Sequence, residues 1–210
     1  MAIAKRAYRS PVREQQALST RNAILDAAAE CFVCGGYART TMKDVAERVG
    51  VSVQSVHLFA TKASLLLAVV ERAIGDGDGV TAPGRGDGLT GAVAARTKSE
   101  KLRRMRAFIR VRMPQAAPVL RAFRDAAPSD PAIAFAWCEH ERRRHADVTT
   151  FVESCAPLLR PDFTIERAAD VAWSAIISPH VADMLMHGRG WTIDEYVDWA
   201  VETFDSMLLR

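Results

Sequence analysis

The chain has 210 residues, of which 49% are hydrophobic and 25% are charged, and its net charge is +3. No stretch approaches the ~20 apolar residues that a membrane-spanning helix needs, which argues against a membrane protein. The first residues contain no apolar signal segment, and the use of four cysteines fits a reducing compartment. We therefore expect a cytoplasmic protein.

Positive charge is concentrated near the N-terminus. Residues 1–62 hold nine Lys or Arg against five Asp or Glu, whereas the rest of the chain holds 19 against 20. Such an excess suits a domain that binds phosphates. Residues 1–18 are expected to form a disordered basic arm, which either follows DNA phosphates and the minor groove or remains solvated without contacts. The arm carries Lys5, Arg6, Arg9 and Arg13.

A first helix is expected from Ser19 or Thr20 to about Cys34. Apolar residues recur on one face of this segment, as an amphipathic helix requires. We therefore place the start of the folded N-terminal domain, residues 19–62, at this helix.

Residues 40–62 have the pattern of two short helices joined by a tight turn. Thr40 or Thr41 can cap the first of them, with Asp44 placed in its first turn. Gly50 supplies the permissive backbone of the turn, and Ser52 caps a second helix over Val53–Phe59. This arrangement is the plan of a DNA-binding helix-turn-helix.

The segment from Arg21 to Leu66 resembles the N-terminal domain of the TetR (tetracycline-repressor-like) regulators. The resemblance covers roughly 45 residues, and it departs from the family pattern at one point, since Phe59 follows His57-Leu58 directly and the second helix is one residue short. The matching elements are Ile24-Leu25-Asp26-Ala27-Ala28, Phe32, Gly36-Tyr37, Thr40-Thr41, Asp44-Val45-Ala46, Gly50-Val51-Ser52, Phe59, Lys62 and Leu65-Leu66.

The remaining residues, 63–210, are expected to form a helical domain for ligand binding and dimerisation. Residues 75–97 are rich in glycine and are interpreted as a loop, because glycine loses much backbone entropy in regular structure. Pro114 and Pro118 are expected to break the next helix, and Asp130 and the Thr192–Glu195 capping box to begin later ones. The expected helices cover 62–74, 100–113, 116–126, 130–155, 162–187 and 192–209. The predicted fold is all-α, with a helix-turn-helix domain followed by a helical bundle.

Residues of the helix-turn-helix are the candidates for DNA contact. Gln54 is the best base reader, because an amide can bond adenine N6 and N7, and Val53 can meet a thymine methyl group. Tyr37 is expected either to reach a phosphate or to pack at the end of the first helix. The other candidates for base or phosphate contact are Thr41, Lys43, Ser52, Ser55, His57 and Lys62.

The C-terminal helices contain candidates for two further sites. Helical bundles form apolar cavities with a few polar groups, although plain core packing explains the same residues. The ligand candidates are Met105, Phe108, Arg112, Phe123, Trp137, His140, Trp173 and Ile177. In the family that the chain resembles, the last two helices form a four-helix dimer interface, and the candidates here are Val181, Leu185, Tyr196 and Trp199.

Two patterns that resemble chemical sites are weak. Cys31-Phe-Val-Cys34 lies at the end of a helix, where the dipole disfavours a thiolate, so ordinary packing is favoured over a redox or metal role. His140 and His145 are five residues apart and face directions about 140° apart on a helix, which does not suit one metal.

We therefore expect no metal, no cofactor and no enzyme. The expectation is a one-component regulator, a homodimeric repressor that binds a palindromic operator and is released by a small apolar ligand. The alternatives are a thiol-dependent sensor or enzyme using Cys31 and Cys34, and a DNA-binding protein without an effector.

Overall fold

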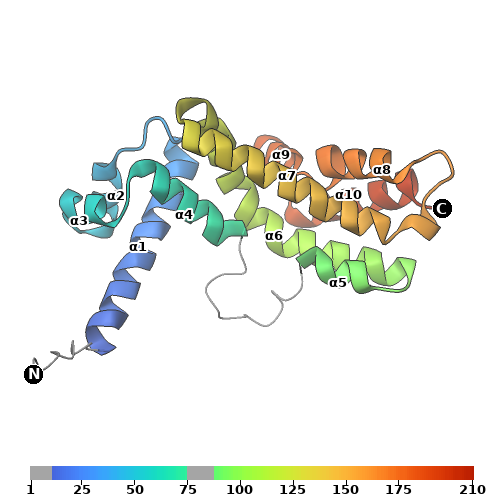
Figure 1. Cartoon of the computed structure of the whole chain (residues 1–210), viewed down its shortest axis with the longest axis horizontal. Coiled ribbons are helices and arrows are strands. Elements are labelled where there is room, and N and C mark those ends of the chain that lie inside the picture. The colour runs from blue at the N-terminus through green and yellow to red at the C-terminus, as the bar shows by residue number, and fades with distance from the viewer. Residues whose placement is uncertain (1–10, 75–87) are drawn as a thin grey trace, which may run out of the picture.

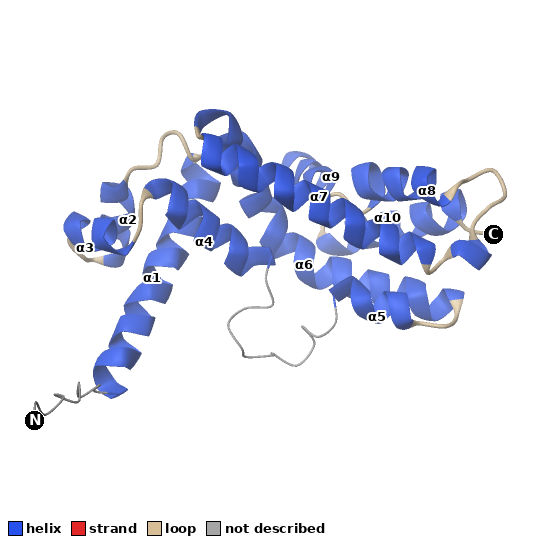
Figure 2. Ribbon diagram, viewed as in Figure 1, coloured by secondary structure: helices blue, strands red, loops and turns tan. Residues whose placement is uncertain are grey.

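The computed structural model describes residues 11–74 and 88–210. Within these residues every extended element is a helix, and the only β pairing is an isolated bridge between Leu159 and Leu209 (Figure 2). The predicted all-α fold is confirmed. The α-helices are α1 (Pro11–Gly35), α2 (Met42–Val49), α3 (Val53–Phe59), α4 (Lys62–Ile74), α5 (Gly88–Ala94), α6 (Lys98–Ala126), α7 (Pro131–Glu153), α8 (Ile165–Val171), α9 (Pro179–Asp183) and α10 (Ile193–Leu208).

The molecule is elongated, with α2 and α3 at one end and α5, α8 and the C-terminus at the other (Figure 1). The buried apolar residues of the described ranges form two clusters, and α6 contributes to both of them. Met105 and Ile109 belong to the C-terminal cluster, whereas Leu120 and Phe123 pack with α1, α2 and α4 in the N-terminal one. Because α6 is one helix, a shift along its axis or a rotation about it changes the packing of both clusters.

Among the described residues no single helix is long and apolar enough to cross a membrane, although α3 and α4, bent by 67° at the break between them, pass the criterion of length and composition together.

Helix α1 begins at Pro11, earlier than the expected start at Ser19 or Thr20. The segment 13–18 consists mostly of good helix formers, and proline is tolerated in a first helical turn because its missing N–H has no partner there. The expectation of a disordered arm over residues 1–18 is therefore wrong for residues 11–18. Residues 1–10, with Lys5, Arg6 and Arg9, lie outside the described residues.

The expectation of a loop over residues 75–97 is wrong for residues 88–94. Residues 75–87 lie outside the described residues, but residues 88–94 form helix α5. The Lys101 ammonium holds the end of this helix, donating to the carbonyls of Ala92 (3.3 Å) and Val93 (3.1 Å) and to Ser154 Oγ (2.9 Å). Tertiary contacts of this kind offset the low helix propensity of two glycines.

Helix α6 continues through Pro114 and Pro118, where a break was expected. Each proline removes one hydrogen bond from the helix, but Pro114 is exposed, so water can reach the carbonyl that it leaves free. The neighbouring Met113, Ala117 and Leu120 are buried, and their packing outweighs the lost bonds.

The helix expected over residues 162–187 is interrupted. Helix α8 passes into a π-helical turn, η3 (Ala172–Ile176), the chain breaks at Ile177 and Ser178, and α9 runs into a second π-helical turn, η4 (Met184–Gly188). Pro179 explains the break, since the residue before a proline avoids helical angles, and Ser178 has φ −106° and ψ 117°. The expected starts at Asp130 and at the Thr192–Glu195 capping box are confirmed.

Candidate DNA-binding surface and ligand cavity

Local hydrogen bonds define the helix-turn-helix. Thr41 Oγ1 accepts from the Asp44 N–H (3.2 Å), and Asp44 Oδ2 accepts from the Thr41 N–H (2.7 Å), which completes a capping box. This backbone hydrogen bond lowers the pKa of the Asp44 carboxyl. Gly50 has φ 77°, a left-handed conformation that ends α2, and Ser52 caps α3 by accepting from the Ser55 N–H (3.1 Å).

Helix α3 presents one exposed face, which we call the reading face: Val53, Gln54, His57 and Leu58. At 100° per residue these side chains fall within about 140° of arc, and all four are exposed. Val56 points the other way and is fully buried. Ser55 lies beside this face, and its hydroxyl is 2.7 Å from the Ser52 hydroxyl.

The two lysines that are expected to contact phosphates differ in exposure and in their partners. Lys43 is exposed and forms a surface pair with Glu47 (3.5 Å). The Lys62 ammonium instead lies 4.3 Å from the centre of the Tyr37 ring and donates to the Ala38 carbonyl (3.4 Å). Burial lowers the pKa of Lys62 and raises that of Tyr37. Lys62 and Tyr37 therefore form one half-buried unit at the start of α4.

A cavity of about 1250 Å³ lies between α4, α5, α6 and α7. Its apolar walls come from α4, α5 and α6, whereas the residues from α7 are mostly polar or charged. Apolar walls with grouped polar side chains are the usual features of a small-molecule site. The lining includes Leu67, Val70, Ile74, Leu89, Val93, Phe108, Arg112, Met113, Leu120, Phe123, Phe135, Glu139, His140, Arg143, Arg144, Asp147 and Ile177.

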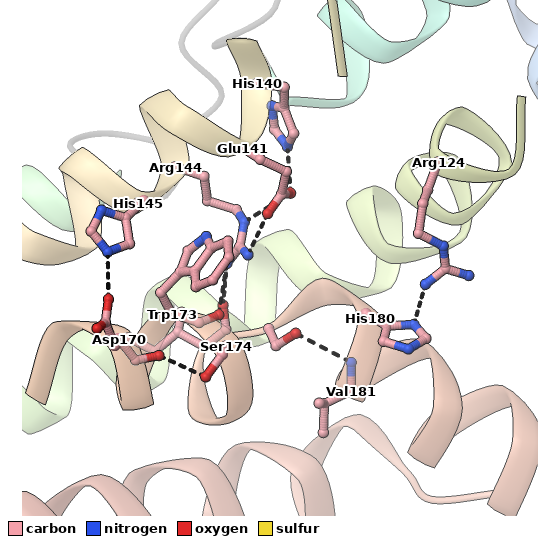
Figure 3. A network of polar contacts seen from close by, with 12 residues as sticks. Arg124, His140, Glu141, Arg144, His145, Asp170, Trp173, Ser174, His180 and Val181 are labelled. Carbon is pink, nitrogen blue, oxygen red and sulfur yellow. Dashed lines mark hydrogen bonds and ion pairs between the residues drawn. The ribbon is translucent and has the colours of Figure 1, made fainter. Parts of the chain in front are cut away.

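The polar wall of the cavity is connected to the break between α8 and α9. Arg144 donates to the carbonyls of Trp173 and Ile177 (3.1 Å each) and forms a two-pronged pair with Glu141 (3.2 and 2.9 Å; Figure 3). The ring of His140 is largely buried, and desolvation lowers its pKa. Its Nε2 has no hydrogen-bond partner among the described residues and lies 3.9 Å from Glu141 Oε1. A neutral His140 therefore faces the carboxylate that orients Arg144.

Residues 24–69 match the family model described as "Bacterial regulatory proteins, tetR family". This segment of the chain is therefore a DNA-binding domain of the TetR family. The match covers α2, α3 and the caps that define the helix-turn-helix, so the protein is a DNA-binding transcriptional regulator. No curated protein sequence matches the chain.

Solved structures share the whole TetR-like fold. A protein described as a transcriptional regulator from Saccharomonospora viridis, in complex with choline, has a TM-score of 0.70 at 16% identity, over 91% of this chain and 98% of that one. A TetR-family regulator from Mesorhizobium loti has a TM-score of 0.63 at 21% identity, over 92% and 98%. NalD, the secondary repressor of the MexAB-OprM multidrug efflux pump in Pseudomonas aeruginosa, has a TM-score of 0.60 at 20% identity, over 93% and 98%.

Five of the eight predicted ligand residues line the cavity. Phe108, Arg112, Phe123, His140 and Ile177 line it. Met105, Trp137 and Trp173 do not line this cavity.

Met105 is fully buried in the C-terminal core. The Trp137 ring packs edge-on against Phe123 at 5.4 Å, and Trp173 packs against Arg144 and His145. Large apolar side chains at helical spacing pack into the core equally well, and the sequence pattern does not separate these two roles.

Sequence reasoning missed the contribution of α4 and α5 to the cavity. No role in the cavity was predicted for Leu67, Val70 and Ile74 of α4, and Leu89 and Val93 were placed in the expected loop of residues 75–97. Phe135, on α7, lines the cavity although it is 72% exposed. The spacing of Leu67, Val70 and Ile74, three and four residues apart on one helix face, was the available signal.

Tyr196 does not belong to a dimer surface, contrary to prediction. Its side chain is fully buried, and its hydroxyl donates to the carbonyls of Ile176 (3.1 Å) and Ser178 (3.2 Å). Tyr196 therefore secures the break between α8 and α9 together with Arg144. Val181, Leu185 and Trp199 are only partly buried within the chain, and Met184 and Met207 are about half exposed.

Neither the cysteine pair Cys31 and Cys34 nor the histidine pair His140 and His145 shares one environment in the structure. Cys31 is buried, which raises its pKa, whereas Cys34 is exposed. A raised pKa disfavours the reactive thiolate. His145 lies 3.0 Å from Asp170 of α8, while His140 faces Phe123 and Trp137, so the two histidines have different neighbours.

Proposed function

We propose that the protein is a cytoplasmic, homodimeric repressor that binds a palindromic operator and is released by a small amphipathic ligand. Residues 19–62 supply the DNA-binding domain, and residues 63–210 supply the ligand-binding and dimerisation domain. The proposal assigns no catalysis, metal or cofactor. A helix-turn-helix monomer buries little surface on DNA, so two copies on two half-sites are needed for a tight site.

The observation that carries the proposal is the position of α4. It begins at Lys62, directly after the short link that follows α3, and its residues Leu67, Val70 and Ile74 line the cavity. A ligand that wedges α4 away from α6 therefore tilts the reading face. In a dimer this tilt changes the spacing of two reading faces, so ligand and operator weaken one another by the same factor.

The proposed ligand is amphipathic because the cavity has two kinds of wall. An apolar body fits against Phe108, Met113 and Leu120, and a polar end fits beside His140 and Arg143 on α7. The Saccharomonospora viridis relative with choline bound supports a small molecule carrying a polar head as the ligand class.

The alternative functions have less support. A filled core would favour a regulator without an effector, but a cavity of about 1250 Å³ is larger than ordinary ligand pockets. A thiol sensor requires a reactive thiolate, and the burial of Cys31 opposes one.

DNA selection followed by a ligand titration tests the proposal. The protein is expected to select a palindromic sequence from a random pool, and this sequence is expected near its own gene. Choline and a set of amphipathic molecules are then screened for a rise in melting temperature, which reports binding to the native state. Each hit is expected to lower operator affinity. Failure to select any DNA sequence would reject the regulator, and hits that leave operator affinity unchanged would reject release by a ligand.

A further inference from the structure

The most exposed large apolar side chain among the described residues is Leu58, at 82%. It lies on the reading face of α3, in the part of the molecule that meets DNA. Isolated apolar residues are common on surfaces, but the neighbourhood of Leu58 is specific. Val53, 37% exposed, lies on the same face, and the amide of Gln54 lies between the two.

Apolar side chains have one partner in the major groove. The C5-methyl group of thymine is the only apolar group that a base pair presents there. Phosphates and the other base edges are polar, and Leu58 can neither donate nor accept a hydrogen bond.

We propose that Leu58 is a specificity-determining residue that reads a thymine methyl group in each half-site. This inference rests on the proposed function. It is separate from the expected contact between Val53 and a thymine, because Leu58 lies five residues further along the helix.

The helix geometry fixes where this thymine lies relative to the base that Gln54 reads. Residues four apart on a helix are separated by about 6 Å along its axis. Successive base pairs are about 3.4 Å apart, so a helix lying along the groove places Gln54 and Leu58 about two base steps apart. The predicted half-site therefore has an adenine with a thymine about two steps away.

Replacing thymine by deoxyuridine tests the proposal, because it removes one methyl group and leaves every hydrogen-bonding group unchanged. Each thymine of the selected operator is replaced in turn, symmetrically in both half-sites, and affinity is measured by fluorescence anisotropy at one salt concentration. At the thymine that Leu58 contacts, the wild-type protein is expected to lose about fourfold in affinity per half-site. This is the loss expected for one methyl group that is no longer buried. Leu58→Ala is expected to bind the thymine and deoxyuridine operators equally at that position.

Two control variants separate the possible causes. Gln54→Ala is expected to lose affinity as wild type does when deoxyuridine replaces the thymine that Leu58 contacts, because Gln54 contacts a different base. Val111→Ala shortens an apolar side chain of α6 that is 37% exposed, like Val53, and is expected to bind both operators as wild type does.

The outcomes separate this inference from the proposed function. If the protein selects an operator but no deoxyuridine position weakens binding, or if every such loss persists in Leu58→Ala, the inference is overturned and the repressor remains. If the protein selects no operator, the proposed function fails and the inference fails with it. Because Leu58 is exposed, its replacement leaves the fold intact.

Discussion

Arg121 bridges Asp183, at the end of α9, to the last turn of α1. The Arg121 Nε lies 3.7 Å from Asp183 Oδ2, and its Nη2 donates to the carbonyl of Val33 (3.2 Å). Asp183 is nearly buried, and its second oxygen has no hydrogen-bond partner among the described residues. One side chain on α6 therefore joins the C-terminal helices to the DNA-binding domain.

This bridge predicts that Arg121→Gln weakens communication between cavity and operator. Removing the guanidinium leaves a buried carboxylate without its cation, so the free energy of unfolding is expected to fall by about 1–3 kcal/mol. The coupling free energy between ligand and operator is expected to fall by about 0.5–2 kcal/mol. Urea unfolding measures the first quantity, and operator titrations with and without ligand measure the second.

Arg110→Gln is the matched control for Arg121→Gln. Arg110 is also on α6, and it pairs with Asp194 at 2.9 Å, but both partners are at least half exposed. Exposed pairs contribute little, so both quantities are expected to stay close to wild type. An equal loss of coupling in the two variants would mean that α6 as a whole, and not the Arg121 bridge, carries the signal.

Gln54→Ala is expected to cost about 1–3 kcal/mol on the selected operator and little on random DNA. An amide that bonds adenine contributes only where adenine is present, whereas a phosphate contact contributes on every sequence. Anisotropy titrations on both DNAs at one salt concentration measure the difference. Equal losses on the two DNAs would show that Gln54 contacts the DNA backbone and not a base.

The helix-turn-helix could be predicted from the sequence because the signals there are local. Thr41 with Asp44, Gly50 and Ser52 each act within one turn of their own helix, so spacing alone predicts their roles. The capping box at Thr192 and Glu195 is local in the same way.

Features that depend on distant contacts were not predictable. The carbonyls that Tyr196 binds are 18 and 20 residues away in sequence, so its aromatic ring could not be assigned to core or surface from spacing. The continuity of α6 through Pro114 depends on packing against α4, α9 and α10, which outweighs the local preference to break.

The partly exposed apolar residues of η4 and α10 predict a dimer surface that a charge would disrupt. Met184→Glu is expected to convert a micromolar dimer into a monomer that loses the operator, because an unpaired charge in an apolar interface costs several kcal/mol. Met184 is 48% exposed in the single chain, so the monomer itself should remain folded. Analytical ultracentrifugation and far-UV circular dichroism measure the two properties. A dimer that persists in Met184→Glu would show that the interface lies elsewhere on the molecule.

Lys101→Met is expected to loosen α5, which forms part of the cavity wall. The variant keeps most of the side-chain volume but leaves the carbonyls of Ala92 and Val93 without the ammonium that they accept from. Each unsatisfied buried group costs about 1–3 kcal/mol, so urea unfolding should show a loss of that order or larger. Lys43→Met, at an exposed surface pair, is expected to change the free energy of unfolding by less than about 0.5 kcal/mol. Hydrogen exchange in residues 88–94 should increase in Lys101→Met alone.

His140 predicts a loss of stability in acid. Desolvation lowers the pKa of His140 in the folded protein, so below pH 6.5, its ordinary value, the unfolded chain binds a proton more readily than the folded one does. Stability should therefore be complete above about pH 6.5, decline as the pH falls towards the folded pKa, and level off below it. One such group contributes a slope of at most about 1.4 kcal/mol per pH unit.

His140→Gln removes this titration while keeping a polar side chain of similar size. Urea unfolding of wild type and variant at pH 7.5, 6.5 and 5.5 is expected to show a smaller acid loss in the variant. His187→Gln, at an exposed position on η4, is expected to follow wild type at every pH. Parallel curves for wild type and His140→Gln would show that His140 titrates in the same range folded and unfolded. The wall facing Glu141 and Arg144 would then carry an ordinary, hydrated histidine, and the polar end of the cavity would have to be assigned to Arg143 instead.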